Sequence, residues 1–256
     1  MRNFLVKLAF NGARYHGWQR QQNAYTVQQA VEEALCALLK EDITVSGCSR
    51  TDAGVHAREY CLSFKTQSGI NERGLLIGLN DKLPPDIGAF SVREMPEGFH
   101  ARFDCRGKEY EYVVLNRELK DPFRADTALR WRWPIDAELL DREAKGFIGE
   151  HDFKTFCSAE CDKENTTRTI FDYGVRRVGD EVRFTVSGSG FLYNMVRITV
   201  GTLLYIGAGK LPRGCIPELI QARDRTRAGI TVEPQGLCLN RVFYDDEPKE
   251  IKETQQ

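Results

Sequence analysis

The sequence predicts an α+β fold of two similar α/β halves, each with a mainly antiparallel sheet and helices packed on one face. Two observations predict it. Short segments with alternating apolar residues are separated by segments with apolar residues at helical spacing, and the order of these elements occurs twice along the chain. We expect the halves to span residues 1–104 and 105–245, to join edge to edge, and to leave a cleft between them.

The first half begins with a strand, because Phe4, Val6, Leu8 and Phe10 alternate with residues of mixed polarity. The segment 26–40 is predicted to be a helix that opens with a capping box formed by Thr26 and Gln29. Its apolar face contains Val27, Ala30, Val31, Ala34, Leu35, Leu38 and Leu39. Further strands are expected at 43–48, 60–65 and 87–92, with a loop at 50–57 and a short helix at 75–79.

The second half repeats this succession. Strands are predicted at 109–115, 170–178, 181–187 and 237–244, and Gly179-Asp180 forms the turn between the middle two. Helices are predicted at 136–148, 190–206 and 216–222. The charged and polar segment 246–256 is expected to be a disordered tail.

Composition limits the class of protein. Apolar residues make up 41% and charged residues 29% of 256 residues, which is typical of a soluble folded protein. The net charge of −1 gives no general attraction to a polyanion, so such a partner needs a local basic patch. The longest apolar stretch, 191–206, is interrupted by Asn194 and Arg197 and is too short to span a membrane. Eight scattered cysteines and the lack of a signal peptide predict reduced thiols and a cytoplasmic location.

Four stretches combine glycine, aromatic and charged residues: 10–21, 46–60, 99–112 and 190–197. Aromatic side chains beside arginines can stack on bases and hold phosphates, which suggests nucleic-acid binding. Residue type alone leaves an alternative open, in which these are loops whose aromatics cover the core and whose arginines face water.

The stretch Ser49-Arg50-Thr51-Asp52-Ala53-Gly54-Val55-His56-Ala57 resembles the signature of the TruA family of tRNA pseudouridine synthases. Collinear stretches resemble the other motifs of that family at 10–21, 80–87, 99–110, 149–153, 167–170, 190–201 and 235–237. The sequence departs from the family at Ser49, where glycine is usual, and at Cys238, where tyrosine is frequent.

The resemblance implies an isomerase that converts uridine to pseudouridine in the anticodon stem-loop, at positions 38, 39 and 40 of tRNA. It implies an RNA-binding cleft between the halves, base flipping, a homodimer with tRNA across both subunits, and no cofactor or metal.

The resemblance also implies roles for single residues. Asp52 is the catalytic carboxylate and Arg197 its partner, while Tyr110 stacks on the target uracil and acts as, or relays to, the base at C5. Tyr112 lies on the same strand face, so residue type alone does not choose between the two tyrosines. Arg50 helps to displace the flipped nucleotide. The other residues expected to bind tRNA are Phe99, His100, Arg102, Phe103 and Arg168.

Two other hypotheses remain open. A catalytically silent RNA-binding protein would use the same cleft, although a carboxylate beside a polyanion repels phosphate and has no purpose in binding alone. A metal- or thiol-dependent enzyme would use His151, Cys157 and Cys161, whose spacing matches no standard zinc pattern. His56, at the end of the signature, is expected to be structural.

Overall fold

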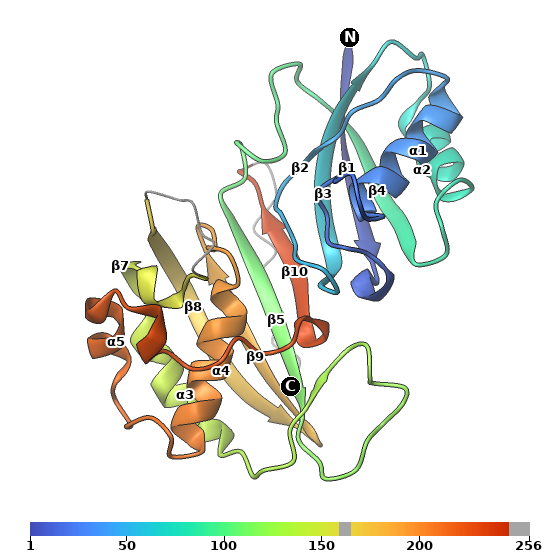
Figure 1. Cartoon of the computed structure of the whole chain (residues 1–256). Helices are drawn as coiled ribbons and strands as arrows, with labels where there is room; N and C mark the ends of the chain where they lie inside the picture. The colour runs from blue at the N-terminus through green and yellow to red at the C-terminus, as the bar shows by residue number, and fades with distance from the viewer. Residues whose placement is uncertain (159–164, 246–256) are drawn as a thin grey trace, which may run out of the picture.

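The computed structural model describes residues 1–158 and 165–245, so the predicted tail at 246–256 lies outside the described residues. One ten-stranded sheet runs through the described chain in the order β4-β1-β3-β10-β5-β9-β8-β7, with β2 paired to β3 and β6 paired to β5. All its pairings are antiparallel except β10 with β3 and β5 with β6. The predicted α+β fold class is confirmed (Figure 1).

Strand β10 (Leu237–Phe243) joins the two groups of strands. It lies between β3 (His56–Thr66) and β5 (Gly107–Leu115). Its register with β3 is short and parallel, with Cys238 opposite His56, whereas its register with β5 is antiparallel and extends over most of its length. In Figure 1 the red strand β10 lies between the green β5 and the teal β3. The division at residues 104 and 105 remains a prediction.

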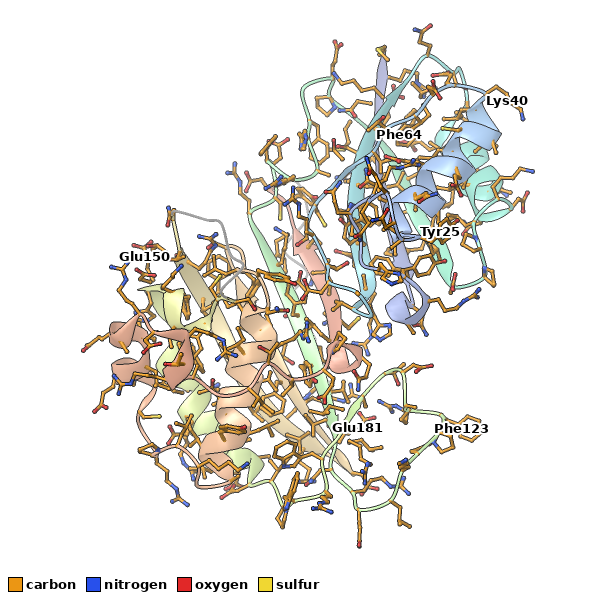
Figure 2. The ribbon with its side chains drawn as sticks, in the orientation of Figure 1. Tyr25, Lys40, Phe64, Phe123, Glu150 and Glu181 are labelled. Atoms are coloured by element: carbon orange, nitrogen blue, oxygen red, sulfur yellow. The ribbon has the colours of Figure 1, made fainter. Side chains whose placement is uncertain are left out.

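On the N-terminal side, β1 (Arg2–Phe10) pairs with β3 and with β4 (Ile87–Met95), and β2 is only Ser46–Gly47. Helix α1 (Val27–Leu39) begins where the capping pattern predicts, because the Thr26 side chain accepts a hydrogen bond from Gln29 N. Helix α2 (Glu72–Asn80) is longer than predicted, since the Asn71 side chain accepts a hydrogen bond from Gly74 N and so caps the start of the helix. Figure 2 shows Phe64 inside this half and Lys40 at the end of α1.

The C-terminal side consists of strands β5, β6 (Leu129–Arg130), β7 (Gly149–Asp152), β8 (Thr167–Val178) and β9 (Glu181–Gly188). Helices α3 (Ala137–Ala144), α4 (Met195–Gly207) and α5 (Ile216–Ala222) belong to the same half. The loop between β5 and β6 projects from the sheet and exposes the Phe123 ring almost completely (Figure 2).

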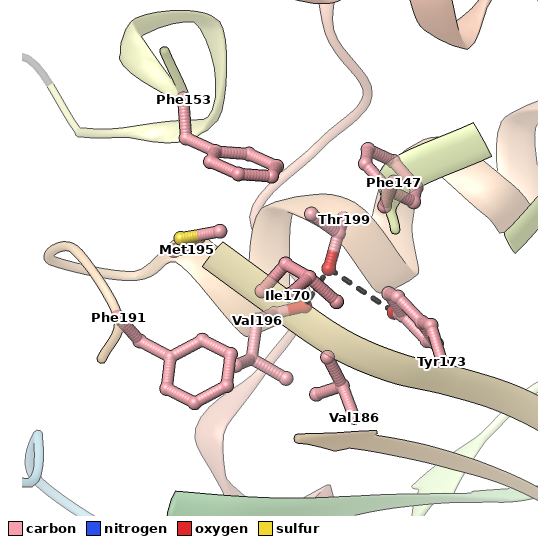
Figure 3. A pocket seen from close by; sticks show the side chains of 9 residues that line it. All are labelled: Phe147, Phe153, Ile170, Tyr173, Val186, Phe191, Met195, Val196 and Thr199. Atoms are coloured by element: carbon pink, nitrogen blue, oxygen red, sulfur yellow. Dashed lines mark hydrogen bonds between the residues drawn. The ribbon is translucent and has the colours of Figure 1, made fainter. Parts of the chain in front are cut away.

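Helix α4 is seated on a packed apolar cluster. Figure 3 shows Phe147, Phe153, Ile170, Tyr173 and Val186 around Met195, Val196 and Thr199 of its first turns. The Tyr173 and Thr199 hydroxyls lie 3.1 Å apart, and Thr199 Oγ1 also donates to Val196 O at 2.9 Å. These contacts fix the first turn of α4. They therefore also fix the direction in which the side chain of Arg197, the residue after Val196, projects from the helix.

Several predicted boundaries are wrong, among them the start of β3, which begins at His56 and not at 60. Helix α4 begins at Met195 and not at 190, because Asn194 has a left-handed backbone (φ +60°) that no helix continues through. Helix α3 ends at Ala144 and is followed by a 3-10 turn, Lys145–Phe147. The strand expected at 43–48 shrinks to two residues, because Ile43 N and Val45 N donate to Cys36 Sγ and Glu32 Oε1 instead of to a neighbouring strand.

Six cysteines of the described chain are thiols, and one is not. Cys157 takes part in a disulfide, so the expectation that every cysteine is reduced is wrong at that position. Among the described residues, no helix combines the length and the apolar character needed to cross a membrane.

Candidate active site

The loop that carries Asp52 is held by the stretch at 10–21. Trp18 N donates to Thr51 O at 3.1 Å, and Gly54 N donates to Tyr15 O at 3.2 Å. Gly17 has φ +80°, and a Cβ on it would clash with the Thr51 carbonyl oxygen, so only glycine fits. Two of the four glycine- and aromatic-rich stretches therefore form one unit that presents Asp52.

Asp52 and Arg197 are brought together from segments on opposite sides of β10. Nη1 of Arg197 lies 3.3 Å from Oδ2 of Asp52, and the two side chains are 15% and 23% exposed respectively. The pair is partly buried, so its attraction is screened less by water than that of a surface pair. The structure thus brings together the carboxylate and the arginine that the sequence analysis selected.

The Arg197 guanidinium has two further acceptors. Its Nε donates to Val232 O at 2.7 Å, and its Nη1 also donates to Asn194 Oδ1 at 2.7 Å. Both distances are shorter than the one to Asp52. The guanidinium is therefore held in place chiefly by Val232 and Asn194.

Burial raises the pKa of Asp52 above its ordinary value, while the charge of Arg197 and its hydrogen bond oppose that rise. The charge of such a carboxylate is less well solvated than that of a carboxylate in water. A pKa shifted by burial in this way is typical of functional carboxyl groups. The balance between burial and Arg197 decides how much of Asp52 is ionised at a given pH.

Tyr110 of β5 lies near enough to Asp52 for the carboxylate charge to influence its pKa. Its hydroxyl is 3.3 Å from Ser49 Oγ, and its ring meets Phe191 edge-on with centroids 5.2 Å apart. Burial, the largest influence, raises the pKa of Tyr110 above its ordinary value, and the Asp52 charge adds to that rise. Tyr110 is therefore a protonated phenol at neutral pH.

The structure distinguishes Tyr110 from Tyr112. Tyr112 is fully buried, and its hydroxyl donates to Glu233 O at 2.7 Å. Tyr110 is the tyrosine that contacts the Asp52 loop, through Ser49. The alternating direction of strand side chains sends Glu111, which lies between them, to the opposite face of the sheet, where it pairs with Arg58 at 2.7 Å.

The stretch at 99–103 is anchored elsewhere. In the described chain its backbone and rings contact Asn3, Ser63 and Tyr244, and not Asp52, Tyr110 or Arg197. Phe99 is half-buried against Tyr244, whereas the Phe103 ring is 73% exposed. His100 lies 4.3 Å from that ring and Arg102 lies over it at 5.8 Å. The stretch presents an aromatic and cationic group, with the His100 ring tilted against that of Phe103, to solvent.

The two remaining predicted arginines differ in exposure. Arg50 is exposed, two residues before Asp52. Arg168 is half-buried and donates to Thr167 O and Asn165 O, and burial lowers its pKa. A Cβ on Gly190 would lie 3.8 Å from Cδ of Arg168, so this arginine runs beside the segment that leads to α4.

Both ring nitrogens of His56 contact backbone groups, which is consistent with the expected structural role. Its Nδ1 accepts from Gly12 N at 3.0 Å, and its Nε2 lies 3.2 Å from Gln235 O. An accepting Nδ1 requires the proton to be on Nε2, which then donates to Gln235 O. The neutral ring links the start of β3 with the segments before α1 and β10.

The metal hypothesis finds little support in the described residues. His151 Nε2 lies 3.0 Å from Ile148 O, and Cys157 is buried and takes part in a disulfide. Cys161 lies outside the described residues. Within the described ranges, no group of three or more His, Cys, Asp and Glu residues is placed to hold a metal ion.

Sequence reasoning missed the residues that support the site. Asn194 and Ser49 were within the quoted stretches, but nothing in their residue types indicated a contact with Arg197 or Tyr110. Val232 acts through a backbone carbonyl, which every residue carries, so no sequence signal exists for it.

Known proteins resemble this chain over most of its length. A family model described as tRNA pseudouridine synthase matches residues 8–104 and 144–245. A "tRNA pseudouridine synthase A 2" of Clostridium perfringens is 43% identical over 244 residues, covering 95% of this chain and 100% of the relative. Proteins named tRNA pseudouridine synthase A from Geotalea daltonii and Thermoanaerobacter sp. are 42% and 38% identical with the same coverage.

Proposed function

Because the chain belongs to the tRNA pseudouridine synthase family, an isomerase family, we propose that it converts uridine to pseudouridine in tRNA. We further propose that its targets are uridines 38, 39 and 40 of the anticodon stem-loop. The observation that carries the proposal is the Asp52 carboxylate, paired with Arg197 and adjacent to the protonated Tyr110.

The reaction defines what this site must supply. The bond from C1′ of the ribose to N1 of uracil breaks, the uracil rotates, and a new bond joins C1′ to C5. The proton at C5 leaves and N1 gains one, so substrate and product have the same atoms and the same oxidation state. The proposal therefore includes no cofactor and no metal.

Asp52 is the proposed catalytic carboxylate. Its charge, stabilised by Arg197, can attack the ring, attack the sugar carbon, or remove a proton from the sugar. Each route needs an ionised carboxylate in contact with the nucleoside. The partly buried pair meets the first need, and the 23% exposure of the Asp52 side chain leaves it open to a flipped nucleotide.

Tyr110 is proposed to hold the uracil ring. A phenol that stays protonated at neutral pH is a poor base, so stacking fits it better than proton removal. Only 5% of Tyr110 is exposed, and uracil therefore needs a neighbouring side chain to move before it stacks. The half-buried Phe191 ring is the aromatic neighbour of Tyr110.

We propose that tRNA is bound by Arg50, by the stretch at 99–103 and by Arg168. The exposed Phe103 ring with His100 and Arg102 suits a base and a phosphate. Since the net charge is −1, the cations must be gathered on one surface. A homodimer with tRNA across both subunits, acting in the cytoplasm, would double that surface.

Release of tritium from tRNA tests this function. Purified protein is incubated with unmodified tRNA transcripts carrying tritium at uracil C5, with Asp52→Ala alongside. The expected result is release by the wild type and none by the variant. Transcripts with cytidine at 38, 39 and 40 should release nothing. Release that persists from these transcripts would disprove modification at positions 38, 39 and 40. Tight binding without release from any tRNA would support a catalytically silent RNA-binding protein instead.

A further inference from the structure

Arg197 shares one nitrogen between two oxygens of different charge. Its Nη1 is 2.7 Å from the neutral amide oxygen of Asn194 and 3.3 Å from the carboxylate oxygen of Asp52. A charged acceptor ordinarily makes the shorter bond. The reversed order shows that the guanidinium is set by Asn194 and by Val232 O, and that the Asp52 carboxylate meets a cation already in position.

Asn194 is itself fixed on both sides. Its Nδ2 donates to Ser158 Oγ at 2.7 Å, which orients the amide oxygen toward Arg197. Its backbone is left-handed at φ +60°, a conformation that asparagine tolerates better than most residues. Its carbonyl oxygen accepts from Ile198 N at 2.9 Å and so opens α4. The same residue therefore sets the start of the helix and the place of its guanidinium.

We propose that Asn194 is a positioning residue for the reaction. Its side chain holds the Arg197 guanidinium beside Asp52 without neutralising the guanidinium charge, which therefore acts on the Asp52 carboxylate. This inference rests on the proposed function for its kinetic effect, but its electrostatic effect exists in the free protein. Among the described residues, the charge of Asp52 acts on Arg197 and Tyr110, and the charge of Arg197 acts on Asp52 and Tyr112.

The neutral side chain is the important property. An amide accepts the hydrogen bond without neutralising the guanidinium. Asn194→Asp has nearly the same shape and tolerates the same backbone, but it places a second carboxylate on the same nitrogen. That carboxylate competes for Arg197 and repels the Asp52 charge, so Asp52 should hold its proton to a higher pH.

Two variants and two measurements test the proposal. Asn194→Asp changes the charge, and Asn194→Gly keeps the left-handed backbone but removes the acceptor. The Asp52 carboxyl is titrated in the free protein by carbon NMR, with its signal assigned by its absence in Asp52→Asn. The pH profile of kcat/KM for tritium release is measured on the same proteins.

In Asn194→Asp we expect the Asp52 midpoint and the acid limb of kcat/KM to move together to higher pH, by about one unit. In Asn194→Gly we expect kcat to fall about tenfold or more, because the guanidinium loses one of its two short bonds. The glycine variant also covers the case in which the aspartate variant fails to fold.

Unchanged Asp52 titration in Asn194→Asp, or wild-type kcat in Asn194→Gly, would overturn the inference while leaving the proposed function standing. If the wild type releases no tritium from any tRNA, the proposed function fails. The titration of Asp52 in the free protein then still decides whether Asn194 controls the pair.

Discussion

The guanidinium of Arg197 lies 3.3 Å from the carboxylate of Asp52, although 145 positions separate them in the chain. Asp52 comes from a loop on the N-terminal side of the sheet and Arg197 from the first turn of α4 on the C-terminal side. The pair therefore depends on contacts between segments that lie far apart in the chain.

Replacing Asp52 with asparagine should abolish turnover and leave the fold intact. We expect tritium release to fall by more than about a thousandfold, as for loss of a catalytic nucleophile. Because the native pKa of Asp52 is raised, ionising it costs stability as pH rises above the usual carboxyl range, and that cost persists at neutral pH. Asp52→Asn should thus melt at or above the wild-type temperature at pH 7, as calorimetry would measure.

The same variant should bind tRNA with nearly wild-type affinity in a filter-binding assay at fixed salt. Loss of binding along with activity would mean that Asp52 acts on the fold of its loop and not on the chemistry.

Arg197→Lys should reduce kcat by about a hundredfold or more. A lysine ammonium is a point charge and lacks the planar fork with which the guanidinium reaches Asp52, Asn194 and Val232 together. Single-turnover kinetics on labelled tRNA measure the effect, with Arg176→Lys, at an exposed arginine of β8, as the matched control. Near-normal rates would remove the pairing from the mechanism.

The burial of His56 leads us to expect that the fold loses stability in acid. Burial lowers its native pKa below the usual 6.5, so the unfolded chain binds this proton more readily than the native protein. Its contribution to stability is therefore present above about pH 6.5 and is lost as pH falls below it. Urea unfolding between pH 7.5 and 5 should show this decline.

The control for this prediction is His56→Gln, which cannot take up a proton in that range. Its stability should be lower at pH 7.5, where the bond from Gly12 N is made in the wild type, and should change less toward pH 5. A wild-type slope in His56→Gln would assign the acid sensitivity to another group.

Arg102 and Phe103 should affect binding and not chemistry. Arg102→Ala should lower the slope of log affinity against log salt by about one, as expected for one lost phosphate contact. Phe103→Ala should weaken tRNA binding by about 1–3 kcal/mol if the exposed ring stacks on a base. Phe123→Ala, on another exposed ring, is the comparison, and equal losses from both would indicate a general aromatic effect.

Much of the fold follows from local patterns. The capping pair at Thr26 and Gln29 locates the start of α1, because a side-chain oxygen there satisfies a backbone donor that the helix leaves free. The start of α4 was missed for the opposite reason. Residues 191–193 are as apolar as the helix that follows, and only the left-handed backbone of Asn194 separates the two.

The lost strand at 43–48 has a different cause. Ile43 and Val45 are buried as a strand pattern predicts, but their amides are satisfied by Cys36 and Glu32 side chains of α1. Apolar alternation reports burial and does not report the partner of each amide.

For the site, resemblance to a known family selected Asp52, Arg197 and Tyr110, and the structure brings them together. The two short hydrogen bonds that hold Arg197 depend on the backbone torsion angle of Asn194 and on the carbonyl oxygen of Val232, which residue identity does not encode. The tRNA-contacting roles of Arg50, Arg168 and residues 99–103 stay predictions.

Strand β10 lies between β3 and β5 although it follows every other strand in the chain. During synthesis, a ribosome-bound chain can carry the complete Asp52 loop and the complete α4 before the segment that unites their sheets has been made. We therefore expect the carboxylate to meet its arginine only after residues up to Phe243 have left the exit tunnel. A chain that ends upstream of β10 should lack the strand that joins β3 to β5.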